Sequence, residues 1–89
     1  MTIKQTVLTA ISEERIFQDR KWGNIDLNPY EVGSCLLIME TCLHKAKLAY
    51  SSQKGDEGAL DEIRKAVAVG VACMEQHGPV FRDPIDFVE

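Results

Sequence analysis

Apolar residues recur at helical spacing in three stretches of the chain, and polar or turn-forming residues separate these stretches. In the first stretch, residues 3–21, an apolar stripe lies along one side and charged residues occupy the other faces. The stripe consists of Ile3, Val7, Ala10, Ile11 and Phe17. Gly23 ends the pattern and lies in the turn-forming segment KWGNIDLNP. The spacing therefore predicts a first helix over residues 3–21.

The second stretch has a start signal and the broadest apolar stripe. Asn28 suits an N-cap, Pro29 suits the first helical position, and Glu31 suits the positive end of the helix dipole. One seam then follows alternating steps of four and three residues: Val32, Leu36, Met39, Leu43, Ala46 and Tyr50. Four more residues widen it: Cys35, Ile38, Cys42 and Ala49. So wide a stripe favours burial on two sides, against the chain's own helices and against another subunit.

The third stretch runs from about Ala59 to His77, after the polar connection SSQKGDEG. Its stripe contains Leu60, Ile63, Val67, Gly70 or Val71, and Met74. Because glycine lowers helix propensity, we expect Gly70 to permit a close contact between helices. Gly78 suits the C-cap.

We therefore predict an all-α fold, with a helical domain over residues 1–78 and a C-terminal tail over residues 79–89. In the tail, Phe81, Ile85 and Phe87 would either dock on a neighbour or be loosely ordered. The pattern contains no strand signal, no repeat and no low-complexity segment.

Length and charge narrow the function classes. A chain of 89 residues forms one domain with a small core, which makes association with a second copy a reasonable expectation. The net charge of −4 argues against a partner that is a long nucleic acid. The local basic pairs Arg20–Lys21 and Lys45/Lys47 are either solvated charges or a grip for one phosphate-bearing small molecule.

Cysteine usage indicates a reducing compartment. Cys35, Cys42 and Cys73 lie in apolar helical stretches and form no CxxC pair, so they are expected to be free thiols rather than zinc ligands. Charges throughout residues 1–20 argue against a signal peptide. No apolar run approaches the roughly 20 residues that span a bilayer. We expect a cytoplasmic protein without a membrane partner.

Two groups of residues are candidates for chemistry. In EERIFQDRKWG, residues 13–23, an indole able to stack on a base lies near cationic groups able to meet a phosphate. Alternatively, Trp22 covers the core, with solvated charges around it. In the second helix, Glu40 and His44 lie one turn apart, as do Glu62 and Lys65 in the third. Antiparallel packing would let the two glutamates approach and hold a divalent cation, unless both helices simply carry exposed ion pairs.

Three blocks resemble the MazG-like superfamily of all-α nucleoside triphosphate pyrophosphohydrolases, in particular its small phage-borne members. The blocks are EERIFQDRKWG at 13–23, LLIMETCLHKAK at 36–47 and LDEIRKAVAVGVACMEQHG at 60–78. The resemblance covers about residues 7–78. It implies a three-helix subunit whose long second and third helices pack antiparallel, and which assembles into a dimer or tetramer with the second helix near the interface.

The family holds Mg²⁺ with an EExxE motif on one helix and an ExxD motif on the next. Glu40 matches the first glutamate of EExxE, while Thr41 and His44 stand at the second and third. Glu62 matches the glutamate of ExxD, and Lys65 replaces the aspartate. Because most of the acidic positions have changed, the resemblance favours a nucleotide binder over an efficient hydrolase.

Three functions follow as expectations. The first is binding of a nucleotide or nucleotide-derived signal in the host cytoplasm, by Arg15, Gln18, Lys21, Trp22, His44 and Lys65. The second is residual Mg²⁺-dependent pyrophosphohydrolase activity, with Glu40 and Glu62 as metal ligands and Asp61 as a further acid. The third is a helical interaction module that binds a host protein.

Overall fold

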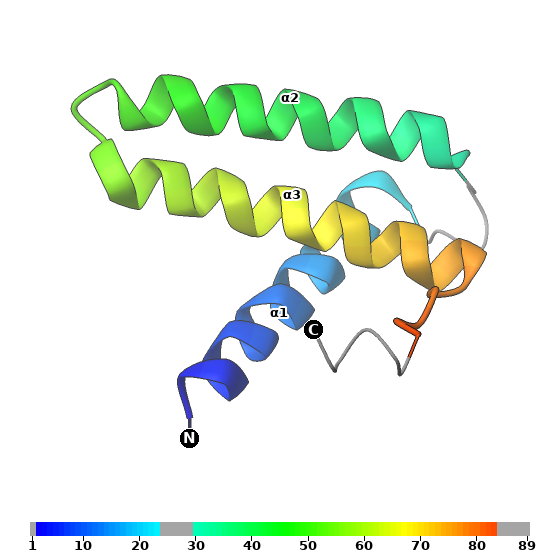
Figure 1. The fold of residues 1–89 in the computed structure, drawn as a ribbon. Helices are drawn as coiled ribbons and strands as arrows, with labels where there is room; N and C mark the ends of the chain where they lie inside the picture. Colours follow the sequence, from blue (N-terminus) through cyan, green and yellow to red (C-terminus); the bar gives the residue numbers. More distant parts are fainter. Residues whose placement is uncertain (1, 24–29, 84–89) are drawn as a thin grey trace.

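The computed structural model describes residues 2–23 and 30–83. It contains three α-helices, α1 (Ile3–Trp22), α2 (Val32–Tyr50) and α3 (Gly55–His77), and the described residues include no β-strand. A short turn joins α2 and α3 into an antiparallel hairpin, and α1 crosses α3 at a steep angle (Figure 1). The all-α, three-helix prediction is therefore confirmed.

Local signals set the ends of α1. Thr2 forms a capping box with Gln5, because the Gln5 amide donates to Thr2 Oγ1 at 3.1 Å and the Thr2 amide donates to Gln5 Oε1 at 2.8 Å. At the other end, Gly23 adopts a φ of 88°, a backbone conformation that other residues rarely take. The predicted end of the helix is thus correct to within one residue.

The boundaries of the hairpin differ from the prediction. The predicted N-cap Asn28 and first helical residue Pro29 lie outside the described residues, but α2 begins only at Val32, after an extended Glu31 with a ψ of 153°. Conversely, α3 begins at Gly55 rather than Ala59. Asp56 and Glu57 lie in its first turn, where carboxylates are favoured by the helix dipole. Much of the segment expected to be a flexible connection is therefore helical.

The hairpin is held together by small side chains. The buried apolar residues are Cys35, Ala46, Ala66, Ala68 and Val69, and none of the larger described side chains is fully buried. A Cβ on Gly70 would lie 3.2 Å from Met39 Cε, so glycine at this position lets α2 approach α3 closely, as the sequence predicted. The hydrophobic core of a single chain is consequently thin.

The packing of α1 departs from the sequence pattern. Its apolar stripe is largely open to solvent, with Val7 50% and Phe17 54% exposed. The buried side chains of α1 are instead polar, namely Glu14, Arg15 and Gln18. Although α1 packs on α3, no described Cα atoms of α1 and α2 lie within 8 Å of each other. The three helices therefore leave an open wedge between α1 and α2, with α3 as its floor.

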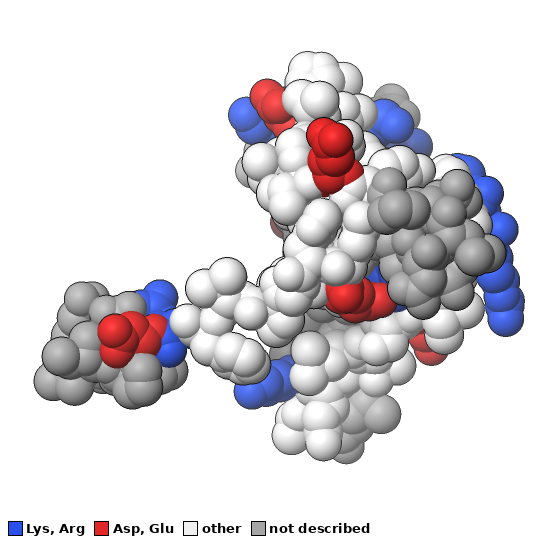
Figure 2. All heavy atoms as spheres, turned by 90° about the vertical axis from the view of Figure 1, so that its right-hand side faces the viewer, with Lys and Arg blue, Asp and Glu red and all other residues white. Residues whose placement is uncertain are grey.

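The chain after α3 leaves the helices. Val80 is 97% exposed and Phe81 is 86% exposed, whereas Ile85 and Phe87 lie outside the described residues. Seen from the end of the molecule where α3 finishes, charged side chains are scattered among uncharged ones (Figure 2). None of the described helices combines the length and apolarity that crossing a bilayer requires.

Two glycine substitutions test the packing of the hairpin turn. A Cβ at position 58 would lie 2.6 Å from Lys54 Cβ and 3.1 Å from Ala49 Cβ, whereas a Cβ at position 33 has nothing within 4 Å. We expect Gly58→Ala to lower the free energy of unfolding by about 1–3 kcal/mol because of this overlap. Gly33→Ala should leave it unchanged or raise it by up to about 1 kcal/mol through helix propensity. Urea unfolding at one protein concentration measures both, and equal effects would contradict the close packing at Gly58.

Candidate functional site

Two adjoining cavities occupy the wedge between α1 and α2. The first, of about 290 Å³, is mainly apolar and has Trp22 and Tyr30 in its wall. The second, of about 590 Å³, is rich in charged side chains. Gln18, Trp22, Ile38 and Val69 line both cavities, so the two adjoin. Together they form the candidate site.

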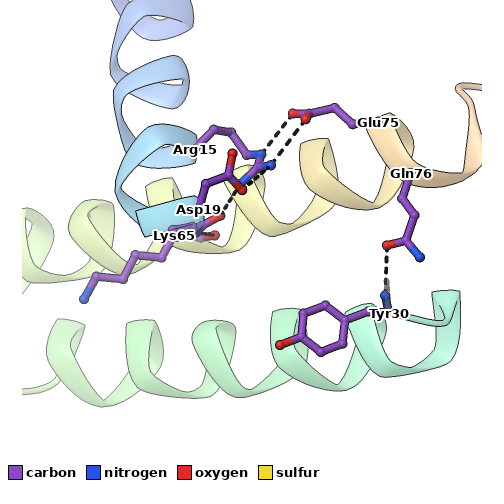
Figure 3. A network of polar contacts seen from close by, with 7 residues as sticks. Arg15, Asp19, Tyr30, Lys65, Glu75 and Gln76 are labelled. Carbon is purple, nitrogen blue, oxygen red and sulfur yellow. Dashed lines mark hydrogen bonds and ion pairs between the residues drawn. The ribbon is translucent and has the colours of Figure 1, made fainter. Parts of the chain in front are cut away.

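A polar cluster around Arg15 builds one side of the first cavity (Figure 3). Arg15 Nε and Nη2 donate to the two carboxylate oxygens of Glu75 at 2.9 and 3.3 Å. Arg15 Nη2 also donates to Asp19 Oδ1 at 3.0 Å. The bond to Glu75, more than any other contact, raises the pKa of the buried Arg15 guanidinium above its ordinary value. Arg15 therefore stays charged and joins α1 to α3.

Gln18 completes this junction. Its side chain is only 3% exposed, and its Nε2 donates to the backbone oxygen of Lys65 at 3.3 Å. Its Oε1 accepts from Arg15 Nη1 at 3.4 Å. Arg15 and Gln18 thus line the cavity, as the sequence suggested for ligand contacts, but their polar atoms already hold two helices together. Their role in the single chain is to fix the shape of the site.

Tyr30 closes the first cavity from the side of α2. Its amide donates to Gln76 Oε1 at 2.9 Å (Figure 3). Its carbonyl oxygen lies 2.8 Å from His77 Nε2. These bonds fix the start of the hairpin against the end of α3. With Tyr30 at 40% exposure and Trp22 at 47%, two aromatic rings remain accessible at the rim. Such rings are suited to stacking on a flat aromatic ligand.

Most of the charged side chains in the second cavity form ion pairs with one another, within α3 or between α1 and α3. Arg64 Nε pairs with the buried carboxylate of Glu14 at 2.9 Å, and Arg64 Nη2 pairs with Asp61 at 2.7 Å. Lys65 Nζ pairs with Glu62 at 3.0 Å and with Asp61 at 3.4 Å. The hydrogen bond from Arg64 is the main cause of a lowered pKa at Asp61, and the bond to Glu62 is the main cause of a raised pKa at Lys65. These side chains are therefore charged and largely compensated.

Two lysines of this cavity have no carboxylate partner among the described residues. Lys21 lies on α1 with its Nζ 5.3 Å from the Trp22 ring centroid and 5.9 Å from that of Phe17. Lys45 lies on α2 and makes no hydrogen bond or ion pair with any described side chain. The two ammonium groups belong to opposite walls of one cavity. They provide the positive charge there that remains available to an anion.

The expected metal ligands are not brought together. Glu40 and His44 line a separate groove between α2 and α3, whereas Glu62 lines the charged cavity and bonds to Lys65. Within the described part of the chain, no three His, Cys, Asp or Glu side chains are placed to hold one metal ion. These residues do not fit Mg²⁺, which favours several converging oxygen ligands. Glu40 and Glu62 line different grooves of the single chain, so a shared metal site for the two stays a prediction that this arrangement does not support.

His44 is likewise separated from the other expected ligand contacts. It faces the groove that contains Glu40, while Lys21, Trp22 and Lys65 line the charged cavity. Sequence reasoning did not single out Tyr30 or the partner of Arg15, Glu75. Arg15 and Glu75 are 60 residues apart, and no local pattern announces their contact. The sequence indicated Lys45 as a possible phosphate contact only through its pairing with Lys47.

The three cysteines are free thiols, as expected. Burial raises the pKa of Cys35, and a hydrogen bond between its side chain and that of Cys73 raises it further. Cys42 lines the charged cavity, and its pKa is raised by burial and then by the negative charge of Glu62. The raised pKa values keep Cys35 and Cys42 in their protonated form at neutral pH.

Comparisons of the chain with protein-family models, with curated proteins and with solved structures give no significant match. The resemblance of the three sequence blocks to MazG-like proteins therefore stays a prediction.

Removing either partner of the Glu14–Arg64 pair should have unequal effects. Glu14 is buried, with a side chain 8% exposed, whereas the Arg64 side chain is 36% exposed. Arg64→Ala leaves a buried carboxylate unpaired, so we expect a loss of about 2 kcal/mol in the free energy of unfolding. Glu14→Ala leaves an arginine that water and Asp61 can solvate, and we expect a loss of about 1 kcal/mol or less. Urea unfolding of both variants measures the two losses. A larger loss for Glu14→Ala would contradict the burial of the Glu14 carboxylate beside a more exposed Arg64.

Thiol alkylation tests the environment of the cysteines. Because the raised pKa of Cys42 means less thiolate, its reaction with iodoacetamide should be slow at neutral pH. The rate should rise about tenfold per pH unit until the pH passes the raised pKa. Cys35, which is 2% exposed, should react more slowly still. Peptide mass spectrometry resolves the sites, and rapid modification of Cys35 in the folded protein would contradict its burial.

Proposed function

We propose that this protein binds a small nucleotide or nucleotide-derived signal in the wedge between α1 and α2, and that it does not use a carboxylate-bound metal to hydrolyse it. The observation that carries this proposal is that an apolar cavity rimmed by Trp22 and Tyr30 adjoins a cavity lined by Lys21 and Lys45. One ligand that joins a flat ring to an anion matches both halves. The resemblance of three sequence blocks to small phage-borne MazG-like proteins points to the same ligand class.

The first cavity supplies the contacts that a base requires. Its volume of about 290 Å³ is near the lower end of the range for small-ligand sites. Apolar side chains such as Ile38 and Val69 exclude water, and the rings at the rim provide stacking surfaces. Asp19, whose side chain is 39% exposed, adds a polar group at the edge, where it can meet the polar edge of a base.

The second cavity supplies the contacts that phosphate requires. The ammonium groups of Lys21 and Lys45 come from opposite walls and have no carboxylate partner among the described residues. Lys65 is tied to Asp61 and Glu62, so it is a weaker candidate than its place in the motif suggested. We therefore assign the phosphate contacts to Lys21 and Lys45.

The intrinsic fluorescence of Trp22 provides a direct test, because this is the chain's only tryptophan. Titration with a panel of mono-, di- and triphosphate nucleotides and cyclic nucleotides, in EDTA, should quench or shift the emission with a saturable curve. The matching nucleoside should bind at least about tenfold more weakly, because it lacks the charge-assisted contacts. No saturable change with any nucleotide would overturn the proposal.

A matched pair of lysine variants locates the phosphate. Lys45 lines the charged cavity and Lys47 lines the groove on the other side of α2. We expect Lys45→Ala to weaken binding about tenfold, the size of one lost charge-assisted contact, and Lys47→Ala to leave it within about twofold. Equal losses in the two variants would show that lysine acts only through net charge. Release of pyrophosphate from the wild-type protein in Mg²⁺ would contradict the absence of a metal-dependent step.

A further inference from the structure

Two of the free thiols lie against each other in the α2–α3 hairpin. Cys35 is near the start of α2 and Cys73 is near the end of α3. A hydrogen bond joins their side chains. The pair is therefore at the open end of the hairpin, far from the short turn that connects the two helices (Figure 1).

The register of the hairpin also places the two cysteines opposite each other. Midway along the hairpin, a Cβ on Gly70 of α3 would lie 3.2 Å from Met39 Cε of α2. One helical turn back along α2 from Met39 leads to Cys35. One helical turn forward along α3 from Gly70 leads to Cys73. Because the two helices are antiparallel, position 35 faces position 73.

The close packing of α2 and α3 brings the two backbones within reach of a disulfide. Packed helices have axes about 8–10 Å apart and Cα atoms about 2.3 Å from each axis, so facing Cα atoms are roughly 3.5–5.5 Å apart. This range overlaps the roughly 4.4–6.8 Å that the Cα atoms of a disulfide span. Since the two side chains already share a hydrogen bond, no other side chain stands between them.

Cys42 is placed too far along the helix to replace either member of the pair. It follows Cys35 by two turns of α2, which is a displacement of about 10.5 Å along the helix axis. It lines the charged cavity between α1 and α2. The chain therefore combines one pair of facing thiols with a third thiol that serves as an internal control.

The two members of the pair differ in their access to solvent. Cys73 is half-buried, whereas Cys35 is only 2% exposed. In a two-step thiol–disulfide exchange, the accessible thiol reacts with the reagent in solution and its neighbour then displaces that reagent. The exposures fit Cys73 for the first of these roles and Cys35 for the second.

We propose that Cys35 and Cys73 form a redox-active dithiol, which low-molecular-weight disulfides such as oxidised glutathione convert into a disulfide that links α2 to α3. The bond closes the open end of the hairpin, whose other end is closed by the connecting turn. It also fixes one wall of the first cavity, because Cys35 lies in that wall. Formation of the bond does not rest on the nucleotide binding proposed above, and its test needs no nucleotide.

Two exchange steps account for every atom and electron. The Cys73 thiolate attacks one sulfur of oxidised glutathione, which gives a mixed disulfide and one glutathione thiolate. The Cys35 thiolate then attacks the Cys73 sulfur and releases the second glutathione. The protein gives up two electrons and two thiol protons, and the two glutathione thiolates take them up as thiols. Because the raised pKa of Cys35 limits its thiolate, the second step should become faster as the pH rises above neutrality.

Peptide mapping without reductant tests the link. The full chain is incubated with oxidised glutathione at about pH 8, quenched by alkylation and cleaved after glutamate, which puts the three cysteines in different peptides. Peptides 32–40 and 63–75 should be joined within one chain in most molecules, and dithiothreitol should separate them. Glutathione retained on Cys73 without this link, a link to Cys42, or a link between two chains in place of it would overturn the proposal.

Thermal unfolding tests the effect of the bond on the hairpin. Because the disulfide closes a loop of about 40 residues, the oxidised wild type should have a Tm about 10 °C or more above that of the reduced wild type. Cys42→Ala should keep this difference to within about 3 °C, whereas Cys35→Ala and Cys73→Ala should each abolish it.

Each variant is compared with itself in the oxidised and reduced forms at one protein concentration, so the effect of the substitution on folding cancels. An oxidised wild type that melts at the same temperature as the reduced one would overturn the closing of the hairpin by this bond. A difference in Cys73→Ala as large as that of the wild type would overturn the assignment of the pair.

Discussion

The arrangement of this protein depends on a polar junction between α1 and α3. Arg15 donates to Glu75, Glu14 accepts from Arg64, and Gln18 donates to the backbone of Lys65. Buried charges persist only when they are paired, so these contacts fix where α1 crosses α3. That crossing holds α1 away from α2 and opens the wedge. If α1 packed through its apolar stripe instead, the cavities between Trp22 and Lys45 would not exist.

The contact between α2 and α3, unlike the polar junction of α1 with α3, is made by small side chains. Alanines, Cys35 and Gly70 let α2 and α3 lie close together, and the large leucines that would normally fill a core point outward. A single chain therefore buries little apolar surface and retains a long uncovered row.

The charges of the wedge are the basis of the proposed function, which is recognition of a ligand without metal-assisted hydrolysis. The carboxylates near it are engaged by Arg64 and Lys65, so they are not available to gather around a cation. The ammonium groups of Lys21 and Lys45 lack such partners among the described residues, and aromatic rings stand next to them. In the proposed function, these two lysines hold the phosphate directly.

Periodicity alone determined the three helices, the two glycine stops and the close approach at Gly70, because these depend on local spacing and backbone freedom. It also identified Trp22 and Lys21 as candidates, since residue type shows what a side chain can bind. It could not determine which faces meet. The start of α3 was moved by Asp56 and Glu57, and α1 was turned by its pairing with Glu75 and Arg64. Only the tertiary structure separated Glu40 and His44 from Glu62 and placed Lys45 opposite Lys21, because a site depends on how helices rotate against one another, and contacts between residues far apart in the chain set that rotation.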